Sequence, residues 1–169
     1  MLILFIYDFI ILMPIISIIL LIPGRIQGYY YRNHFKGRKL LNKKDYMQSI
    51  KYSKEFIEDI RLNNWKKKLI LLSWGIYSKD IEAMTLNNLG VAYLELGDLK
   101  VANEYFNETI EIDSLYCLPY FNLSILENVK GDIEMSKMFY KKSVELGFKQ
   151  TTFDNVIQKA QQILVEIEG

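Results

Sequence analysis

The fold is decided by residues 83–116, which read AMTLNNLGVAYLELGDLKVANEYFNETIEIDSLY. The following 34 residues, 117–150, read CLPYFNLSILENVKGDIEMSKMFYKKSVELGFKQ and repeat the pattern of the first stretch. Matching positions include Leu89 and Leu123, Gly97-Asp98 and Gly131-Asp132, and Phe106 and Tyr140. A period of this length is typical of stacked helical hairpins, each too small to bury its own apolar face. The sequence therefore predicts an all-α fold, a short solenoid of helical hairpins.

A Gly-Asp pair lies at the centre of each copy and predicts a tight turn between two helices. Gly97 and Gly131 can take the left-handed conformation that ends a helix. Asp98 and Asp132 can then cap the next helix by accepting hydrogen bonds from its free N–H groups. Small residues beside the turn, such as Ala102, allow the two helices to pack closely. We expect each copy to be a pair of antiparallel helices.

Residues 83–116 resemble a tetratricopeptide repeat, whose signature runs Trp-x2-Leu-Gly-x2-Tyr, then Ala-x3-Phe, then Pro. The residues that carry the match are Leu89-Gly90, Tyr93, Ala102 and Phe106, while Leu86 replaces the Trp and Ser114 replaces the Pro. The copy at 117–150 departs further, with Ser124 for the Gly, Glu127 for the Tyr and Phe148 for the Pro. The resemblance implies a protein-binding scaffold, not an enzyme, because this family's repeats host many unrelated partners.

The segments that flank the two copies are also predicted to be helical. Residues 151–169 place apolar residues at helical spacing on one side, as a C-terminal capping helix of a solenoid requires. Residues 40–82 contain one helical stripe from Tyr46 to Ile60 and a mostly apolar stretch from Trp65 to Tyr77. We expect residues 40–82 to form one degenerate hairpin, in which the stripe fits either the first or the second helix.

The N-terminal residues are strongly apolar, with Asp8 the one charged side chain among the first 22 residues. About 20 apolar residues are enough for a helix to cross a bilayer core. Residues 1–23 are therefore predicted to be a transmembrane helix. A cleaved secretory signal is the alternative, but no basic residue precedes the apolar run and no small-x-small cleavage site follows it. Asp8 fits either the outer interface or a contact with a partner helix.

Residues 24–39 are predicted to be a basic juxtamembrane stalk. Residues 25–68 carry 13 Lys and Arg against 4 Asp and Glu, whereas residues 69–169 carry 8 Lys against 15 Asp and Glu. The positive-inside rule then predicts a single-pass membrane protein with its C-terminal repeat domain in the cytoplasm. We expect the stalk to contact anionic lipid headgroups. The run Lys66-Lys67-Lys68 has three interpretations: contact with lipid headgroups, contact with nucleic acid, or a solvated helix end. Nucleic acid is not expected as a partner.

The sequence contains no recognisable catalytic constellation. It has one His and one Cys, and it lacks the motifs of metal sites and of nucleotide-binding loops. We therefore predict no catalytic residue, no metal and no cofactor. His34, in the stalk, is expected to face solvent or lipid. Cys117 is expected to pack as a small apolar side chain.

The resemblance also implies a peptide-binding groove, because the first helix of each hairpin lines the concave side of a tetratricopeptide array. The residues at the matching places are Met84, Asn87, Asn88, Val91, Leu118, Phe121, Asn122 and Ile125. Glu95, Val129, Asn155 and Lys159 lie beside them in the expected arrangement. In several peptide-binding members an Asn at the place of Asn88 and Asn122 binds the ligand backbone, which suits an amide that donates and accepts. The alternative is an exposed polar helix face with no ligand.

The function predicted from these features is that of a membrane-anchored scaffold that recruits or positions a partner protein at the cytoplasmic membrane face. The Lys and Arg of the family's carboxylate clamp are absent, since Leu118 and Asn122 stand in their places. An acidic C-terminal tail is therefore not the expected ligand. The alternative function is that of a structural or assembly subunit of a membrane complex, whose main contacts are made by the transmembrane helix.

Overall fold

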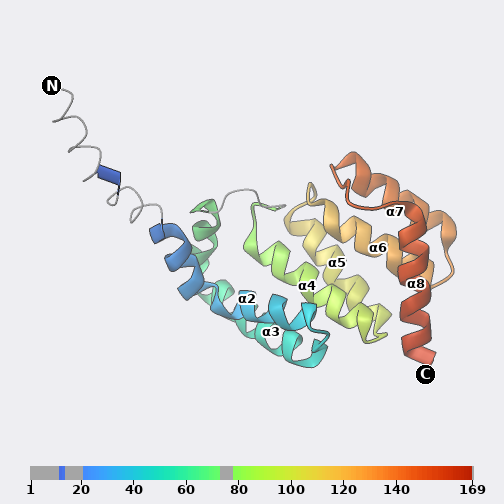
Figure 1. Cartoon of the computed structure of the whole chain (residues 1–169), viewed down its shortest axis with the longest axis horizontal. Helices are drawn as coiled ribbons and strands as arrows, with labels where there is room; N and C mark the ends of the chain where they lie inside the picture. Colours follow the sequence, from blue (N-terminus) through green and yellow to red (C-terminus); the bar gives the residue numbers. More distant parts are fainter. Residues whose placement is uncertain (1–11, 14–20, 73–77, 169) are drawn as a thin grey trace.

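The structure, a computed structural model, describes residues 12–13, 21–72 and 78–168, and their regular secondary structure is helical throughout. Residues 21–30 are helical and continue through a turn at Tyr31. The elements that follow are α2 (Arg32–Asn42), α3 (Tyr46–Leu62), the 3-10 helix η1 (Asn64–Leu72), α4 (Ile81–Glu95), α5 (Leu99–Ile112), α6 (Cys117–Val129), α7 (Ile133–Glu145) and α8 (Phe153–Glu168). Helices α2 to α7 pair in sequence as hairpins and stack along the long axis of the molecule (Figure 1). The described part is therefore the all-helical, solenoid-like fold that the sequence predicts.

The three hairpins of the described chain share one turn geometry. Gly97 and Gly131 have φ angles of 79° and 86°, and Lys44 holds the same place in the first hairpin with φ of 61°. The next residue is an Asp in all three, and Asp45 accepts a hydrogen bond from the Gln48 N–H at 3.3 Å. Asp98 and Asp132 cap α5 and α7 in the same way. The predicted Gly-Asp turns are present, and a third turn of the same kind precedes them.

The first hairpin differs from the predicted division of residues 24–82. It consists of α2 and α3, so much of the predicted stalk is a packed helix, and the stripe from Tyr46 to Ile60 is the second helix of its hairpin, one of the two predicted alternatives. The Ser49 hydroxyl donates to the Gly37 carbonyl at 2.9 Å, as Ser136 donates to Ser124 at 2.7 Å in the third hairpin. Gly37 precedes its counterpart Gly90 by 53 residues instead of 34, because η1 and the residues that follow it are inserted between the hairpins.

The inserted η1 packs against the helix at 21–30 and does not extend the stack of hairpins. The Tyr31 hydroxyl donates to the Lys66 carbonyl at 2.7 Å, and Gln27 Nε2 donates to the Leu69 carbonyl at 2.7 Å. Ile70 is buried, but Trp65 is 50% exposed and Leu71 is 77% exposed. The apolar composition of this stretch favours a helix buried between two layers, but in the structure η1 has one side exposed. Residues 73–77 of the predicted stretch lie outside the described residues.

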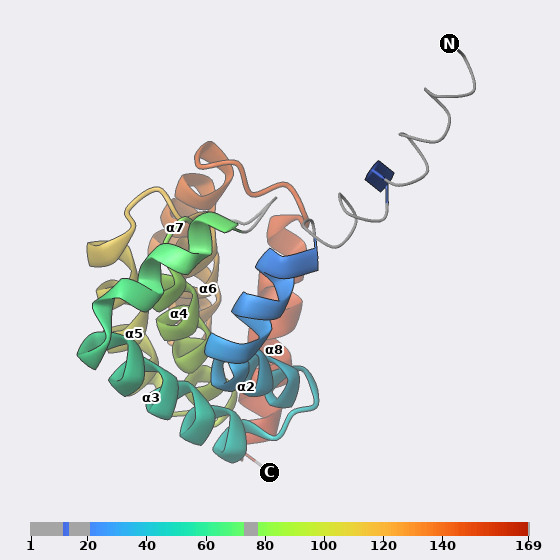
Figure 2. The same cartoon turned by 90° about the vertical axis from the view of Figure 1, so that its left-hand side faces the viewer.

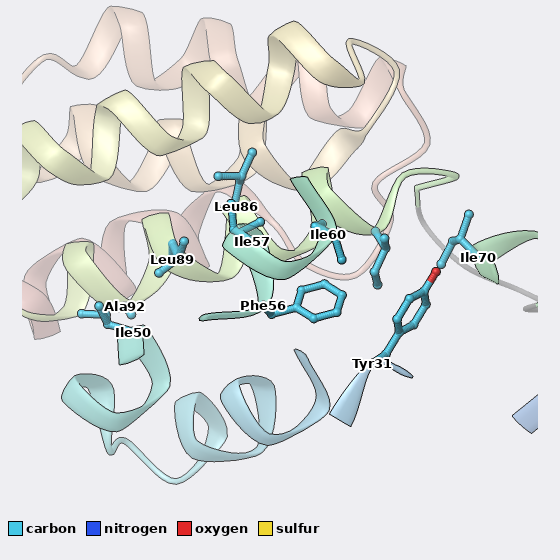
Figure 3. Close-up of a cluster of buried hydrophobic side chains, with 10 residues drawn as sticks. Tyr31, Ile50, Phe56, Ile57, Ile60, Ile70, Leu86, Leu89 and Ala92 are labelled. Carbon is cyan, nitrogen blue, oxygen red and sulfur yellow. The ribbon is translucent and has the colours of Figure 1, made fainter. Parts of the chain in front are cut away.

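Two apolar clusters hold the described elements together. The first joins α3 to α4 through Phe56, Ile57 and Leu86, with Tyr31 packed at its edge (Figure 3). The second joins α4, α5 and α6 to α8 and includes Phe106, which is 0% exposed. Burial of this apolar surface is the main force that turns separate hairpins into one stack.

The prediction of a transmembrane helix at residues 1–23 falls almost wholly on residues outside the described part, Asp8 included. Within residues 12–13, 21–72 and 78–168, no helix combines the length and hydropathy that a membrane crossing requires. Leu21 and Ile22, the last apolar residues of the predicted segment, are 65% and 47% exposed. The transmembrane helix stays a prediction.

Candidate protein-binding groove

The first helices of the three described hairpins, α2, α4 and α6, form one side of the stack, which we call the first-helix face. Figure 2 shows α8 on the same side of the stack as these first helices, and Figure 1 shows it at the end formed by α6 and α7, away from α2. Helix α8 packs chiefly on α6 and far less on α7. A cap that continued the solenoid would pack on α7 as well, just as α4 packs on α3 and α6 packs on α5. The predicted capping helix is instead a strap across the first-helix face.

Apolar contacts and ion pairs fix α8 in this position. Val156, Ala160 and Ile163 are 0% exposed and belong to the cluster shared with α6. Lys159 Nζ lies 2.6 Å from Glu95 Oε1, at the end of α4. The end of α8 reaches the turns of the first two hairpins, where Glu166 pairs with Lys44 at 3.3 Å and Ile167 packs beside Gly97.

Helix α8 covers part of the predicted groove. Ile125 is 5% exposed in the cluster that contains Val156, and Val91 packs against the same cluster. Glu95 and Val129 also contact α8 or its cluster. These side chains, expected to face a ligand, face the chain's own C-terminal helix.

The remaining residues of the predicted groove form what we call the open groove, although one of them, Phe121, packs against the α8 cluster as Val91 does. It consists of Met84, Asn87, Asn88, Leu118, Phe121 and Asn122, all half-buried except Asn87, which is buried. Asn122 Nδ2 donates to Asn87 Oδ1 at 2.9 Å, a bond between neighbouring first helices. This bond uses one donor of the Asn122 amide, which has a second donor and a carbonyl acceptor. The amides and apolar side chains of the open groove can together contact a peptide.

The aromatic wall of the open groove is held from behind. The Phe121 ring stacks on Phe148 with 4.3 Å between ring centroids, and Phe148 is 4% exposed. Phe148 follows α7 at the place where the repeat signature has a Pro. The Phe121 ring is therefore fixed before any ligand binds, which lowers the entropy cost of binding.

His34 lies in the interior, which corrects the expectation that it faces solvent or lipid. It is 1% exposed, and its Nδ1 lies 2.7 Å from Oγ1 of Thr85. The Thr85 hydroxyl donates to the Ile81 carbonyl at 2.8 Å, so Nδ1–H of His34 is the donor to Thr85. Burial, with a smaller contribution from Arg38, lowers the pKa of His34 to about 4. The sequence signal for this contact was the repeat register, since His34 precedes Asn87 by the same 53 residues that separate Gly37 and Gly90.

The basic run at 66–68 is partly neutralised by acidic side chains. Lys66 Nζ lies 2.6 Å from both carboxylate oxygens of Asp59, and Lys67 pairs with Glu82. Glu82 is 4% exposed, and Arg61 Nε donates to it at 2.6 Å. Burial raises the pKa of the Glu82 carboxyl, but its bonds to Lys67 and Arg61 outweigh burial and lower it below its ordinary value. These ion pairs join α3, η1 and α4, so the charges of Lys66 and Lys67 serve the fold.

The described residues contain no cluster of three or more His, Cys, Asp or Glu side chains that fits a metal ion. Cys117 is buried at the start of α6, and burial raises the pKa of its thiol. A buried thiol with a raised pKa is a poor nucleophile, because the thiolate is the reactive form.

Residues 85–114 match the family model of the tetratricopeptide repeat. This stretch contains most of α4 and all of α5. A TPR repeat-containing protein of Methanocaldococcus jannaschii is 24% identical over 140 residues, which is 75% of this chain and 25% of that protein. The chain thus spans about a quarter of the length of this curated relative. One hairpin of this chain thus matches the tetratricopeptide repeat, and the other two described hairpins keep the same turn geometry.

Proposed function

We propose that this protein is a non-enzymatic scaffold that binds an extended or helical segment of a partner protein in the open groove. The observation that carries the proposal is the placement of Asn88, Asn122 and Phe121 on neighbouring first helices of tetratricopeptide-like hairpins. Amide groups can form hydrogen bonds with the backbone of a bound segment, and half-buried apolar side chains can contact its apolar side chains. Because α8 covers Ile125 and the end of α4, the bound segment is short and lies over the first turns of α4 and α6.

The proposal includes a location at a membrane. The apolar run at 1–23 is long enough to cross a bilayer, and the basic residues after it favour repeats on the cytoplasmic side. The scaffold then recruits or positions its partner at the cytoplasmic membrane face. Basic side chains that follow the apolar run would contact anionic headgroups.

A structural or assembly subunit is the second candidate. The observation that favours it is the coverage of Ile125 and Val91 by α8, which leaves less surface for a ligand than an uncovered array offers. In this case the predicted transmembrane helix makes the main contacts with a multi-span partner, and the hairpins brace the complex.

Substitution of the groove amides separates the two candidates. In the full chain, purified from membranes with its partner, Asn88→Ala with Asn122→Ala should weaken partner retention about tenfold through loss of two hydrogen bonds. Asn107→Ala is the matched control, because Asn107 is an exposed amide on α5. Asn88→Ala alone, which spares the bond between Asn122 and Asn87, should show part of the loss. Full retention in the folded double variant would favour the structural subunit.

A further inference from the structure

A second pocket, of about 370 Å³, lies where the helix at 21–30 and the start of α2 meet α3 and η1. Its lining includes Tyr29, Tyr30, Arg32, Asp59 and Lys66, and we call it the headgroup pocket. In Figure 1 the first coloured helix after the N-terminus and η1 lie side by side at one end of the molecule. The hydrogen bonds from Gln27 and Tyr31 to η1 hold them together there.

The walls of the headgroup pocket are preorganised. Both oxygens of Asp59 hold Lys66 Nζ at 2.6 Å, and that Nζ lies 5.8 Å from the Tyr30 ring centroid. The Tyr30 ring meets Tyr29 and Trp65 edge to face, with 5.1 Å between centroids in each pair. Asp59 balances the charge of Lys66, so the exposed guanidinium of Arg32 gives the lining a net positive charge.

The surface around the headgroup pocket has the composition of a membrane–water interface. Tyr29 and Trp65 are 75% and 50% exposed, and Leu71, at the end of η1, is 77% exposed. Leu21, about two turns before Tyr29 on the same helix, is 65% exposed. Exposed aromatic rings beside basic and apolar side chains are typical of the headgroup level of a bilayer. The 34-residue register does not require η1, so its exposed Trp65 and Leu71 are not explained by the stacking of hairpins.

We propose that the headgroup pocket binds the phosphate of an anionic phospholipid, with η1 lying on the membrane surface. The Arg32 guanidinium donates hydrogen bonds to phosphate oxygens, because its planar group matches the spacing of two such oxygens. The tyrosine hydroxyls of the lining add neutral donors. This inference rests on the proposed membrane location, because the apolar run that ends at Ile22 brings the pocket to headgroup depth.

The test uses the full chain with Trp74→Phe, which leaves Trp65 as the single tryptophan of the two in the sequence. The chain is reconstituted into vesicles of phosphatidylcholine, with or without phosphatidylglycerol, and a headgroup spin-labelled lipid quenches the Trp65 fluorescence. We expect roughly twofold stronger quenching with phosphatidylglycerol. Arg32→Gln should reduce quenching to the level in pure phosphatidylcholine. The control Lys100→Gln, which removes the same charge from an exposed position on α5, should leave it unchanged.

Each other outcome has a distinct meaning. Failure of the chain to float with phosphatidylcholine vesicles contradicts the membrane anchor of the proposed function. Normal flotation without stronger quenching by phosphatidylglycerol overturns the headgroup pocket and leaves the anchor intact. Equal losses of quenching in Arg32→Gln and Lys100→Gln overturn the headgroup pocket and indicate a non-specific electrostatic attraction between the protein and the anionic membrane. A saturable response of Trp65 to glycerol 1-phosphate in detergent, without quenching in vesicles, assigns the pocket to a soluble phosphate ester instead.

Discussion

Small residues decide how closely the two helices of each described hairpin approach. A Cβ atom added at Gly90 would lie 2.4 Å from Cε1 of Phe106, whose ring is 0% exposed. At Gly37, the equivalent position of the first hairpin, an added Cβ would lie 2.6 Å from the Ser53 hydroxyl oxygen. Ser124 takes this place in the third hairpin, where its carbonyl accepts from Ser136. The crossing point therefore limits side-chain size in all three described hairpins.

Gly90→Ala should destabilise the protein, because the buried Phe106 ring has no room to move. The cost of overpacking exceeds the gain in helix propensity, and we expect a net loss of about 1–2 kcal/mol in the free energy of unfolding. Gly28→Ala is the matched control, since Gly28 is helical and an added Cβ meets nothing within 4 Å. It should be neutral or slightly stabilising. Urea denaturation measures both, and equal effects would contradict the close crossing at Gly90.

His34 should make stability depend on pH between pH 7 and pH 5. Its pKa is about 4 in the folded protein and 6.5 without burial, so in this range the unfolded state binds more protons. Stability should therefore fall by about 2 kcal/mol as pH drops from 7 to 5. His34→Asn keeps a donor toward Thr85 but does not titrate, so its unfolding free energy should change much less across this range. Parallel slopes for the two proteins would show that His34 does not control the effect.

At the scale of elements, a sequence period predicts which helices pair and how hairpins stack, but it does not predict where a terminal helix packs. Helices α4 to α7 follow from the 34-residue register and the Gly-Asp turns. The first hairpin was missed because Lys44 takes the place of the turn glycine and the insertion of η1 shifts the register. The apolar side of α8 was predictable, but an apolar stripe does not specify whether a helix caps the end or covers the first-helix face. Two of the eight predicted groove residues, Val91 and Ile125, therefore face α8 or its cluster, and the other six stay a prediction.

The ion pair between Lys159 and Glu95 tests where α8 docks. The Glu95 side chain is 9% exposed and that of Lys159 is 34% exposed. Lys159→Glu should destabilise the protein by about 1–3 kcal/mol, because two carboxylates then meet at a mostly buried site. The double variant Lys159→Glu with Glu95→Lys should recover most of the loss.

Charge reversal at the exposed pair of Lys137 and Glu134 is the control for this experiment. Both of these side chains are more than half exposed, and exposed pairs contribute little to stability. Reversal of Lys137 should therefore be nearly silent in thermal melts. A silent Lys159→Glu, or a double variant as unstable as the single one, would show that α8 does not lie against the end of α4.

At the scale of the whole molecule, the described chain is a short solenoid with two different ends. One end carries the helix at 21–30 and η1, with the basic run at 66–68. The other end consists of α6 and α7, from which α8 returns across the first-helix face to the first turn. This return leaves the open groove over the first turns of α4 and α6 as the surface for a partner. In the proposed function, a scaffold of this shape would hold its partner at a fixed distance from the proposed headgroup pocket.

Site-specific photo-crosslinking in native membranes tests the central claim, that the open groove binds a partner protein, most directly. A photoreactive side chain is placed in the full chain at Asn88 in the open groove, or at Asn107 on α5 as the control. We predict that the probe at position 88 forms a crosslink to one protein, identified by mass spectrometry, and that the probe at position 107 does not. A crosslink to the same protein from position 107, with none from position 88, would contradict the claim.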